Sequence, residues 1–419
     1  MTKKKKIKTG KKQGSGQQAG LPNRLKELLL PGRLLRLGIG LLLLAGFLAA
    51  LVLLNRPVPG TVPTSASLKT YVPARVLSVL TDNARANDWS EGRRMGSQTL
   101  EVELLGGEYK GELLTGTNFM SAYANIEAKE GTRVIVRLDY DENGEPYIVS
   151  FVNYDRGLVI CGFVLVFSLL LVVIGGKKGL MALLGLIFTV ICLWFLLIPL
   201  LLRGIPPIPA TVGFVAVSAA ASLLLLTGFS RKTLCATLGC VGGVAAAGIF
   251  AAVVGTLTPL NGFNMSEAEE LVLRASDQGL HISSLLVCGV LIAALGAVMD
   301  VAMSIASSCH ELHALNPELT ARQLFRSGMN IGRDAMGTMA NTLILAFAGS
   351  ALNMLILFQA YDYPFLQIIN SDMMSIEILQ GIAGSIGIIL TVPLVAFISA
   401  HVLTLKRKRP CVYKHDSAK

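Results

Sequence analysis

Eight long apolar segments constrain this chain more than any other feature of its sequence. A helix of about 20 apolar residues spans the hydrocarbon core of a bilayer, and each segment approaches or exceeds that length. The hydrophobic fraction of 53% and the charged fraction of 15% are typical of membrane proteins rather than soluble ones. The segments cover residues 37–54, 157–174, 180–202, 210–229, 234–257, 283–304, 336–358 and 376–403. We therefore predict a mainly α-helical integral membrane protein with about eight transmembrane helices.

The polar stretches divide the chain into five parts. Residues 1–36 are predicted to be a disordered basic cytoplasmic tail, and residues 37–54 the first membrane helix. Residues 55–156 are expected to form an extracytoplasmic domain, residues 157–404 a seven-helix membrane domain, and residues 405–419 a second basic cytoplasmic tail. A cleaved signal peptide is the alternative for the first helix. Its apolar core would usually be about 7–15 residues long, so a retained anchor is favoured.

The distribution of charge predicts the orientation in the membrane. The formal net charge is +10, and residues 1–36 alone contain eleven Lys or Arg against the single acid Glu27. No aromatic-studded basic face accompanies this charge, so no nucleic-acid partner is expected. The basic groups between the later apolar segments fall on alternate connections: Lys177-Lys178, Arg231-Lys232, the loop with Arg322, Arg326 and Arg333, and residues 406–409. Arg203, at an outer helix end, is the exception. Because basic loops stay in the cytoplasm, eight spans with both termini cytoplasmic are expected.

The region 55–156 carries the alternation of apolar and polar residues that is typical of β-strands. Leu100, Val102 and Leu104 alternate with acids, and similar patterns occur in 71–80, 111–115, 133–138 and 147–151. About five short strands would close as a small β-barrel or sandwich of the OB or SH3 type. No nucleophile motif or phosphate-binding loop occurs there, so a structural or partner-docking domain is favoured over a catalytic one.

An aspartate inside the sixth apolar segment is the main candidate for chemistry. Asp300 lies about 25 Å along the segment, at 1.5 Å per residue, and begins a polar stripe with i, i+4, i+7 and i+11 spacing. The other members of that stripe are Ser304, Ser307 and Glu311. An intramembrane Asp costs at least about 2.5–3.5 kcal/mol when it faces lipid, so the stripe is expected to turn inward. Asp300 could belong to a proton or cation path, or it could lock two helices by pairing with Arg333 or Asn341.

The next apolar segment offers a second polar stripe. Asp334, Thr338 and Asn341 share the i, i+4, i+7 spacing. Asp334 could take part in the ion path, but a helix-start residue at the membrane surface is the favoured interpretation. Before it, Asn316-Pro317-Glu318 is expected to begin a short amphipathic surface helix. Glu377, near the end of the last segment, is interpreted as an interfacial residue.

The sequence gives little support for a metal site, a disulfide framework or a catalytic site. Cys309, His310, Glu311 and His313 could form a zinc site, but they lack the HExxH spacing. The cysteines fit no disulfide framework, and no Walker A motif or catalytic constellation occurs. We expect no enzyme activity and no cofactor.

Three motifs give the chain its resemblance to a known family. GAVMDVAMSIASS (Gly296–Ser308), GRDAMGTMANTL (Gly332–Leu343) and GSIGIILTVPL (Gly384–Leu394) resemble the YibE/F family of bacterial multi-pass membrane proteins. The resemblance extends from about Tyr71 to the end of the chain and implies a bacterial cytoplasmic membrane location. A more distant likeness is to SecD/SecF and the resistance–nodulation–division permeases, in which Asp300 would match the aspartate of a proton path.

Two functions follow as expectations. The first is a transport or export component coupled to protons or cations through Asp300, with Asn341, Asp334, Ser304, Thr338 and Glu311 as supporting groups. The second is a non-transporting assembly or sensing protein whose outer β domain docks a protein partner while the lipid bilayer surrounds its helices.

Overall fold

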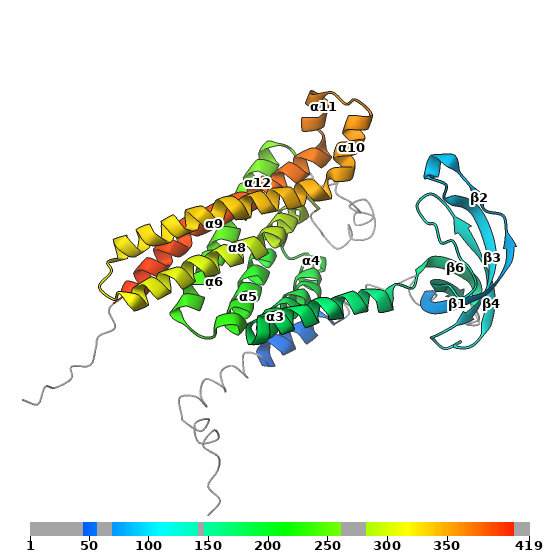
Figure 1. The fold of residues 1–419 in the computed structure, drawn as a ribbon, viewed down its shortest axis with the longest axis horizontal. Coiled ribbons are helices and arrows are strands. Elements are labelled where there is room, and N and C mark those ends of the chain that lie inside the picture. Colours follow the sequence, from blue (N-terminus) through cyan, green and yellow to red (C-terminus); the bar gives the residue numbers. More distant parts are fainter. Residues whose placement is uncertain (1–44, 57–68, 141–145, 261–281, 406–419) are drawn as a thin grey trace, which may run out of the picture. The chain divides into compact units, whose positions relative to one another are not determined.

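The computed structural model describes residues 45–56, 69–140, 146–260 and 282–405 (Figure 1). The predicted basic tail 1–36, residues 37–44 and nearly all of the predicted tail 405–419 lie outside the described residues. The first predicted span is described from Ala45, as an apolar helix Ala45–Leu54. The rest of the described chain comprises a β domain and a set of long helices.

The β domain is a closed five-stranded barrel. Its strands are β1 (Lys69–Asp82), β3 (Arg94–Leu104), β4 (Leu113–Met120), β5 (Arg133–Tyr140) and β6 (Pro146–Tyr154), with the two-residue β2 (Arg85–Ala86) added to β3. The sheet order β1-β5-β6-β4-β3 closes through a further pairing of β1 with β3. The β4–β6 contact is parallel and the other contacts are antiparallel. The predicted barrel is confirmed, with the connectivity of the OB type.

Alternate residues of the strands fill the barrel. The buried set takes every second position of three strands: Val72, Ala74 and Val76 of β1, Leu100, Val102 and Leu104 of β3, and Val134, Val136 and Leu138 of β5. Side chains of a strand alternate between its two faces, so this spacing sends one set inward and leaves the polar set outside. The period-2 pattern of the sequence therefore specified this core.

A polar network joins the end of β1 to β3 and β4. Arg94 donates two hydrogen bonds to the Asp82 carboxylate, at 2.9 and 2.7 Å, and Gln98 Nε2 donates a third at 3.1 Å. The buried Gln98 and Asn118 side chains bond each other and the backbone of 126–128. The hydrogen bonds from Arg94, then those from Gln98 and the Ala84 amide, lower the pKa of Asp82 to about 2.

The helical part begins directly after the barrel. Its elements are α3 (Gly157–Cys192), the π-helical turn η3 (Leu193–Leu197), α4 (Ile198–Leu202), α5 (Pro207–Thr227), α6 (Arg231–Leu257), α8 (Ile282–Leu315), α9 (Ala321–Ser350), α10 (Leu352–Ala360), α11 (Phe365–Ile369) and α12 (Asp372–Thr404). Within the described residues, five helices are long and apolar enough to cross a membrane, or six if the bent pair α9–α10 counts as one. Their large apolar side chains are widely exposed, for example Phe163 at 73% and Ile174 at 83%, as lipid contact requires.

The predicted boundary between the second and third spans is a break inside one continuous helical stretch. Gly157–Leu202 runs for 46 residues, but Gly176 has φ 55° and ψ −135°, which is not helical. Only glycine adopts such a backbone without strain. A Cβ on Gly179 would overlap the carbonyl of Leu171, although residues eight apart in a straight helix are about 12 Å apart. The chain therefore bends back sharply at Gly176.

The basic connections lie at one end of the helical part. Three sets of contacts show how the helices are aligned. Between α3 and α5, Gly185 packs on Ser222 and Thr189 Oγ1 lies 2.7 Å from Ser218 Oγ. Between α6 and α12, Arg231 Nη1 donates to the Val402 carbonyl at 3.2 Å, and on α9 Gly328 packs on Cys309 of α8 and Ala396 of α12. Lys177-Lys178, Arg231-Lys232, the first turns of α9 with Arg322 and Arg326, and the end of α12 consequently share one end.

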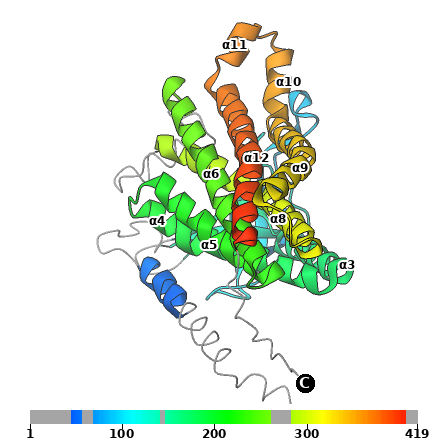
Figure 2. The ribbon, with the colours of Figure 1, turned by 90° about the vertical axis from the view of Figure 1, so that its left-hand side faces the viewer.

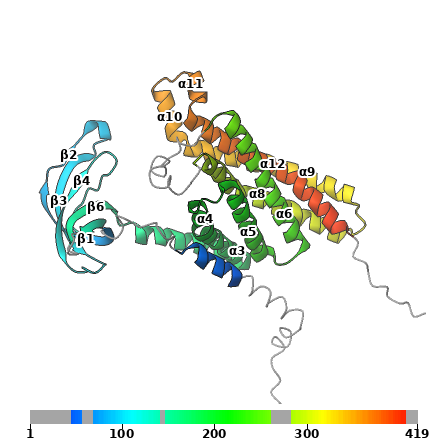
Figure 3. The same ribbon diagram turned by 180° about the vertical axis from the view of Figure 1, so that it is seen from behind.

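The helix α12 lies among α6, α8 and α9 (Figures 2 and 3). It meets α6 along small residues: a Cβ added to Gly243 would lie 3.0 Å from Thr391 Cβ and 3.1 Å from the Gly387 carbonyl oxygen. A Cβ on Gly387 would lie 2.9 Å from Ala247 Cβ. Glycines and alanines four residues apart allow this close approach of two backbones.

The predicted amphipathic helix starting at Asn316 is wrong. Residues 316–320 form a turn, and α9 starts at Ala321 and continues to Ser350 without a break. Thr320 and Gln323 cap it reciprocally, since the Thr320 side chain accepts from the Gln323 amide and the Gln323 side chain accepts from the Thr320 amide. This capping box satisfies two free donors and decides where the helix begins.

Gly243→Ala is expected to destabilise the helical part. The added methyl group has no free space at α12, and overpacking of this kind costs about 1–3 kcal/mol, which exceeds the helix-propensity gain of about 1 kcal/mol from Gly to Ala. Gly255→Ala in the same helix is the matched control, because its Cβ would have no neighbour within 4 Å. Thermal unfolding of the detergent-solubilised full chain should show a lower midpoint for Gly243→Ala alone.

Acid should weaken the wild-type barrel through Asp82. The folded-state pKa of about 2 lies below the unfolded value of about 4, so the stabilisation is complete above pH 4 and is lost as pH falls from 4 to 2. Asp82→Asn removes that component, and its unfolding midpoint should vary less over this range. Glu130→Gln, in an exposed turn, serves as the control. Equal pH dependence in all three proteins would contradict the assignment.

Candidate functional site

Asp300 lies in α8, and the faces of α8 away from Asp300 pack closely against α6, α9 and α12. Leu291 and Val298 face α6 and α12, and Ile305 faces α9. Asp300, Ser304 and Glu311 are exposed within the described chain, and Ser307 is half-buried. The helix continues to Leu315, so all four residues share one polar stripe, as predicted.

The stripe on α8 points away from α12. Successive residues of a helix are rotated by 100°, so Asp300 lies about 200° around the axis from Val298. Val298 contacts the glycine position of α12 at Gly387. The expectation that this stripe turns inward is therefore wrong within the described residues, and Asp300 faces outward from the bundle.

The stripe on α9 also points outward. Gly328 and Gly332 face α8 and α12, with Gly332 against Val392 and Ile305. Asp334 is about 200° around the axis from Gly332, and Thr338 and Asn341 share its exposed face. The interpretation of Asp334 as a helix-start residue is wrong, since α9 begins thirteen residues earlier at Ala321.

The two stripes form no direct bond. Among the described residues, no hydrogen bond or ion pair joins Asp300 to Arg333 or Asn341. The Thr338 hydroxyl donates to the backbone carbonyl of Asp334 at 3.4 Å, which is a contact within α9. The helix lock that the sequence suggested as an alternative therefore lacks both of its predicted partners.

The residues considered as a weakly supported zinc site are spread around the end of α8. Cys309 is buried against Gly328, His310 and Glu311 are exposed, and His313 is half-buried. Within the described part of the chain, no three His, Cys, Asp or Glu side chains are grouped so that they could hold a metal ion.

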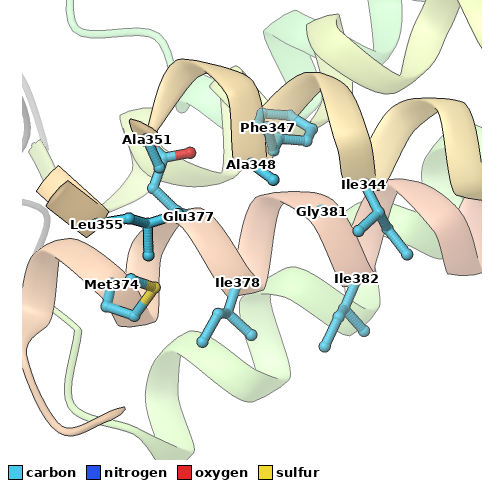
Figure 4. Close-up of a pocket in the computed structure, with 10 residues that line it drawn as sticks. All are labelled: Ile344, Phe347, Ala348, Ala351, Leu355, Met374, Glu377, Ile378, Gly381 and Ile382. Carbon is cyan, nitrogen blue, oxygen red and sulfur yellow. The ribbon is translucent and has the colours of Figure 1, made fainter. Parts of the chain in front are cut away.

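An open, groove-like cavity that the sequence did not indicate lies along α9, α10 and α12, and its lining residues Ile344, Ile378 and Ile382 are themselves exposed. Its volume is about 360 Å³, and Figure 4 shows the Glu377 side chain of α12 extending toward Ala351, while Met374, Ile378 and Ile382 lie on the other side of the α12 ribbon. Glu377 is the one acid among the ten residues that line it. The lining is Ile344, Phe347, Ala348, Ala351, Leu355, Met374, Glu377, Ile378, Gly381 and Ile382. The sequence suggested only an interfacial role for Glu377, and the α9–α10 bend of 57° that shapes the cavity left no clear signal in it.

Three aromatic side chains of the barrel are strongly exposed, and we refer to this set as the aromatic surface: Trp89, Phe119 and Tyr123. Their exposed fractions are 71%, 76% and 100%. The Trp89 loop and the Tyr123 loop are tied together, because Arg93 Nη1 donates to the Ala122 carbonyl at 3.3 Å. Large exposed aromatics are enriched where proteins bind other proteins.

Comparison with known proteins identifies the chain by its helices. A family model described as YibE/F-like protein matches residues 163–405. No curated protein and no solved structure matches the chain. The match covers more than half of the 419 residues and includes both polar stripes and Glu377. Together with the long apolar helices, it shows that this chain is a multi-pass integral membrane protein that belongs to the YibE/F family.

Proposed function

We propose that this chain is a transport or export component of the bacterial cytoplasmic membrane, coupled to protons or cations through Asp300. The observation that supports this proposal is that Asp300 lies within an apolar helix and that its carboxylate forms no hydrogen bond or ion pair with the described residues. A carboxylate whose role is to hold helices together needs a donor, whereas a carboxylate that binds and releases an ion must be accessible. Intramembrane acids of this kind commonly mark ion or proton pathways.

Each outward stripe would form one wall of a path, because the α8 stripe points away from α12 and the α9 stripe points away from α8 and α12. Ser304 on α8, and Thr338 and Asn341 on α9, would supply oxygen and amide groups beside Asp300 and Asp334, and Glu311 would extend the stripe beyond the apolar part. Exposure to lipid would cost at least about 2.5–3.5 kcal/mol for one Asp near the centre of a span. The other wall therefore has to come from protein that the described helices do not supply.

The proposed topology has eight spans and two cytoplasmic termini. The sharp bend at Gly176 favours two spans within Gly157–Leu202, and α9 with α10 would form one bent span. The grouping of the basic connections at one end of the helices supports a cytoplasmic location for that end. The barrel would then lie outside the cytoplasm.

Asp300→Asn tests the coupling. The full chain would be reconstituted in liposomes containing a pH-sensitive dye, and proton entry would be followed after an imposed pH or sodium gradient. The wild type should exceed protein-free liposomes, and Asp300→Asn should fall to their rate because the amide cannot take up a proton or bind a cation. Glu318→Gln, in the 316–320 turn, should retain the wild-type rate.

Thermal unfolding of the same proteins separates coupling from structure. Under the proposal, Asp300→Asn keeps the wild-type unfolding midpoint. A lower midpoint with an unchanged flux would support a helix-locking carboxylate. Flux through Asp300→Asn equal to that of the wild type would refute coupling through this residue.

A second candidate function is assembly or sensing, with the barrel docking a protein partner. The observation that favours this function is the strong exposure of Trp89, Phe119 and Tyr123, because large exposed apolar side chains can mark a site of interaction with another protein. Burial of such residues dominates the energetics of many protein interfaces.

Site-specific cross-linking tests this function in the cells that make the protein. A photoreactive phenylalanine analogue would replace Phe119, and in a control it would replace Glu130 on an exposed turn. A light-dependent adduct with one protein is expected at position 119 and not at position 130. Equal adducts at both positions, or none at 119, would contradict docking through the aromatic surface.

A further inference from the structure

We propose that the cavity around Glu377 binds a compact, lipophilic organic cation, with the Glu377 carboxylate as its counter-ion. The cavity is separate from Asp300, so the proposal stands whether or not the protein transports ions. Its volume of about 360 Å³ falls within the range of small-molecule sites, about 300–1,000 Å³. Such sites are mainly apolar with a few polar groups that orient the ligand.

Glu377 has unused capacity to accept hydrogen bonds. The nearest donor among the described residues is the Ser350 hydroxyl, 3.5 Å from Glu377 Oε2. That hydroxyl lies 2.8 Å from the Phe347 carbonyl oxygen and has a single proton to donate. The shorter contact takes the proton, so the carboxylate remains available to a donor inside the cavity.

The lining determines the class of ligand. Nine of the ten residues that the structure describes around the cavity are apolar or glycine, and none is basic. A carboxylate in such surroundings is stabilised by a cation with hydrogen-bond donors, and a charge-assisted bond is stronger than a neutral one. Isoleucine, leucine, methionine and phenylalanine side chains offer contact to a hydrocarbon body. The ligand therefore combines one ammonium-like group with a small apolar frame.

The bend between α9 and α10 gives the site its shape. Ala351 joins the two helices at an angle of 57°, so Leu355 of α10 and Ala351 both lie beside the Glu377 side chain (Figure 4). A lipid acyl chain could enter the same apolar space, but it would leave the carboxylate without a donor. That difference between a cation and a lipid chain is what the experiment measures.

The test uses the full chain in phosphatidylcholine nanodiscs. Binding of 3-fluoroadamantan-1-amine, a cation, and 3-fluoroadamantan-1-ol, its neutral counterpart, would be followed by fluorine NMR line broadening, with empty nanodiscs subtracted. The amine should bind saturably, and Glu377→Gln should weaken it by about tenfold or more, as expected for loss of a charge-assisted bond. The alcohol should bind more weakly, and Glu377→Gln should leave its affinity unchanged.

Two glycine variants locate the site. A Cβ on Gly381 would lie 3.8 Å from Phe347 at the cavity wall, so Gly381→Leu should fill the space and abolish amine binding while Glu377 remains. Gly349→Leu, where a Cβ meets nothing within 4 Å, should bind the amine as the wild type does. Equal amine binding by Glu377→Gln and wild type, equal binding of amine and alcohol, or full binding by Gly381→Leu would each overturn the proposal.

Discussion

The close crossing of α6 and α12 is the contact on which the helical part depends. Inside a membrane, apolar burial between helices gains little over contact with lipid, so association relies on close packing. Gly243 and Gly387 let the two backbones meet with no side chain between them. With α12 held there, one end positions Glu377 against α9, and the other presents Val392 and Ala396 to the glycines of α9.

The polar groups of the membrane domain are arranged in contrasting ways. Asp300 and Asp334 face away from the packed helices, while Glu377 lies in a cavity between them. A carboxylate on the outside of such a bundle requires water or another protein beside it, and a carboxylate in an apolar cavity requires a donor. All three carboxylates lack an ion-pair partner among the described residues.

Several elements were predictable because their signals are local. Strand alternation in 71–138 identified the barrel core, since a period of two leaves one choice of buried face. The start of α9 was missed although Thr320 and Gln323 form a recognisable capping signature, because Asn316-Pro317 offered a competing one. Because the start of α9 was missed, Asp334 was wrongly interpreted as a helix-start residue, although it lies in the middle of α9.

By itself, the sequence determined the class of protein, the barrel strands and the polar stripes. The lengths of the apolar segments predict the class of protein, and the periodicity of residues along single strands and helices predicts the barrel strands and the polar stripes. The tertiary structure decided which way each stripe points, how β4 and β6 close the barrel, and that Glu377 opens into a cavity. A period shows which residues share a face, but the neighbours that cover or expose that face come from segments far apart in the chain.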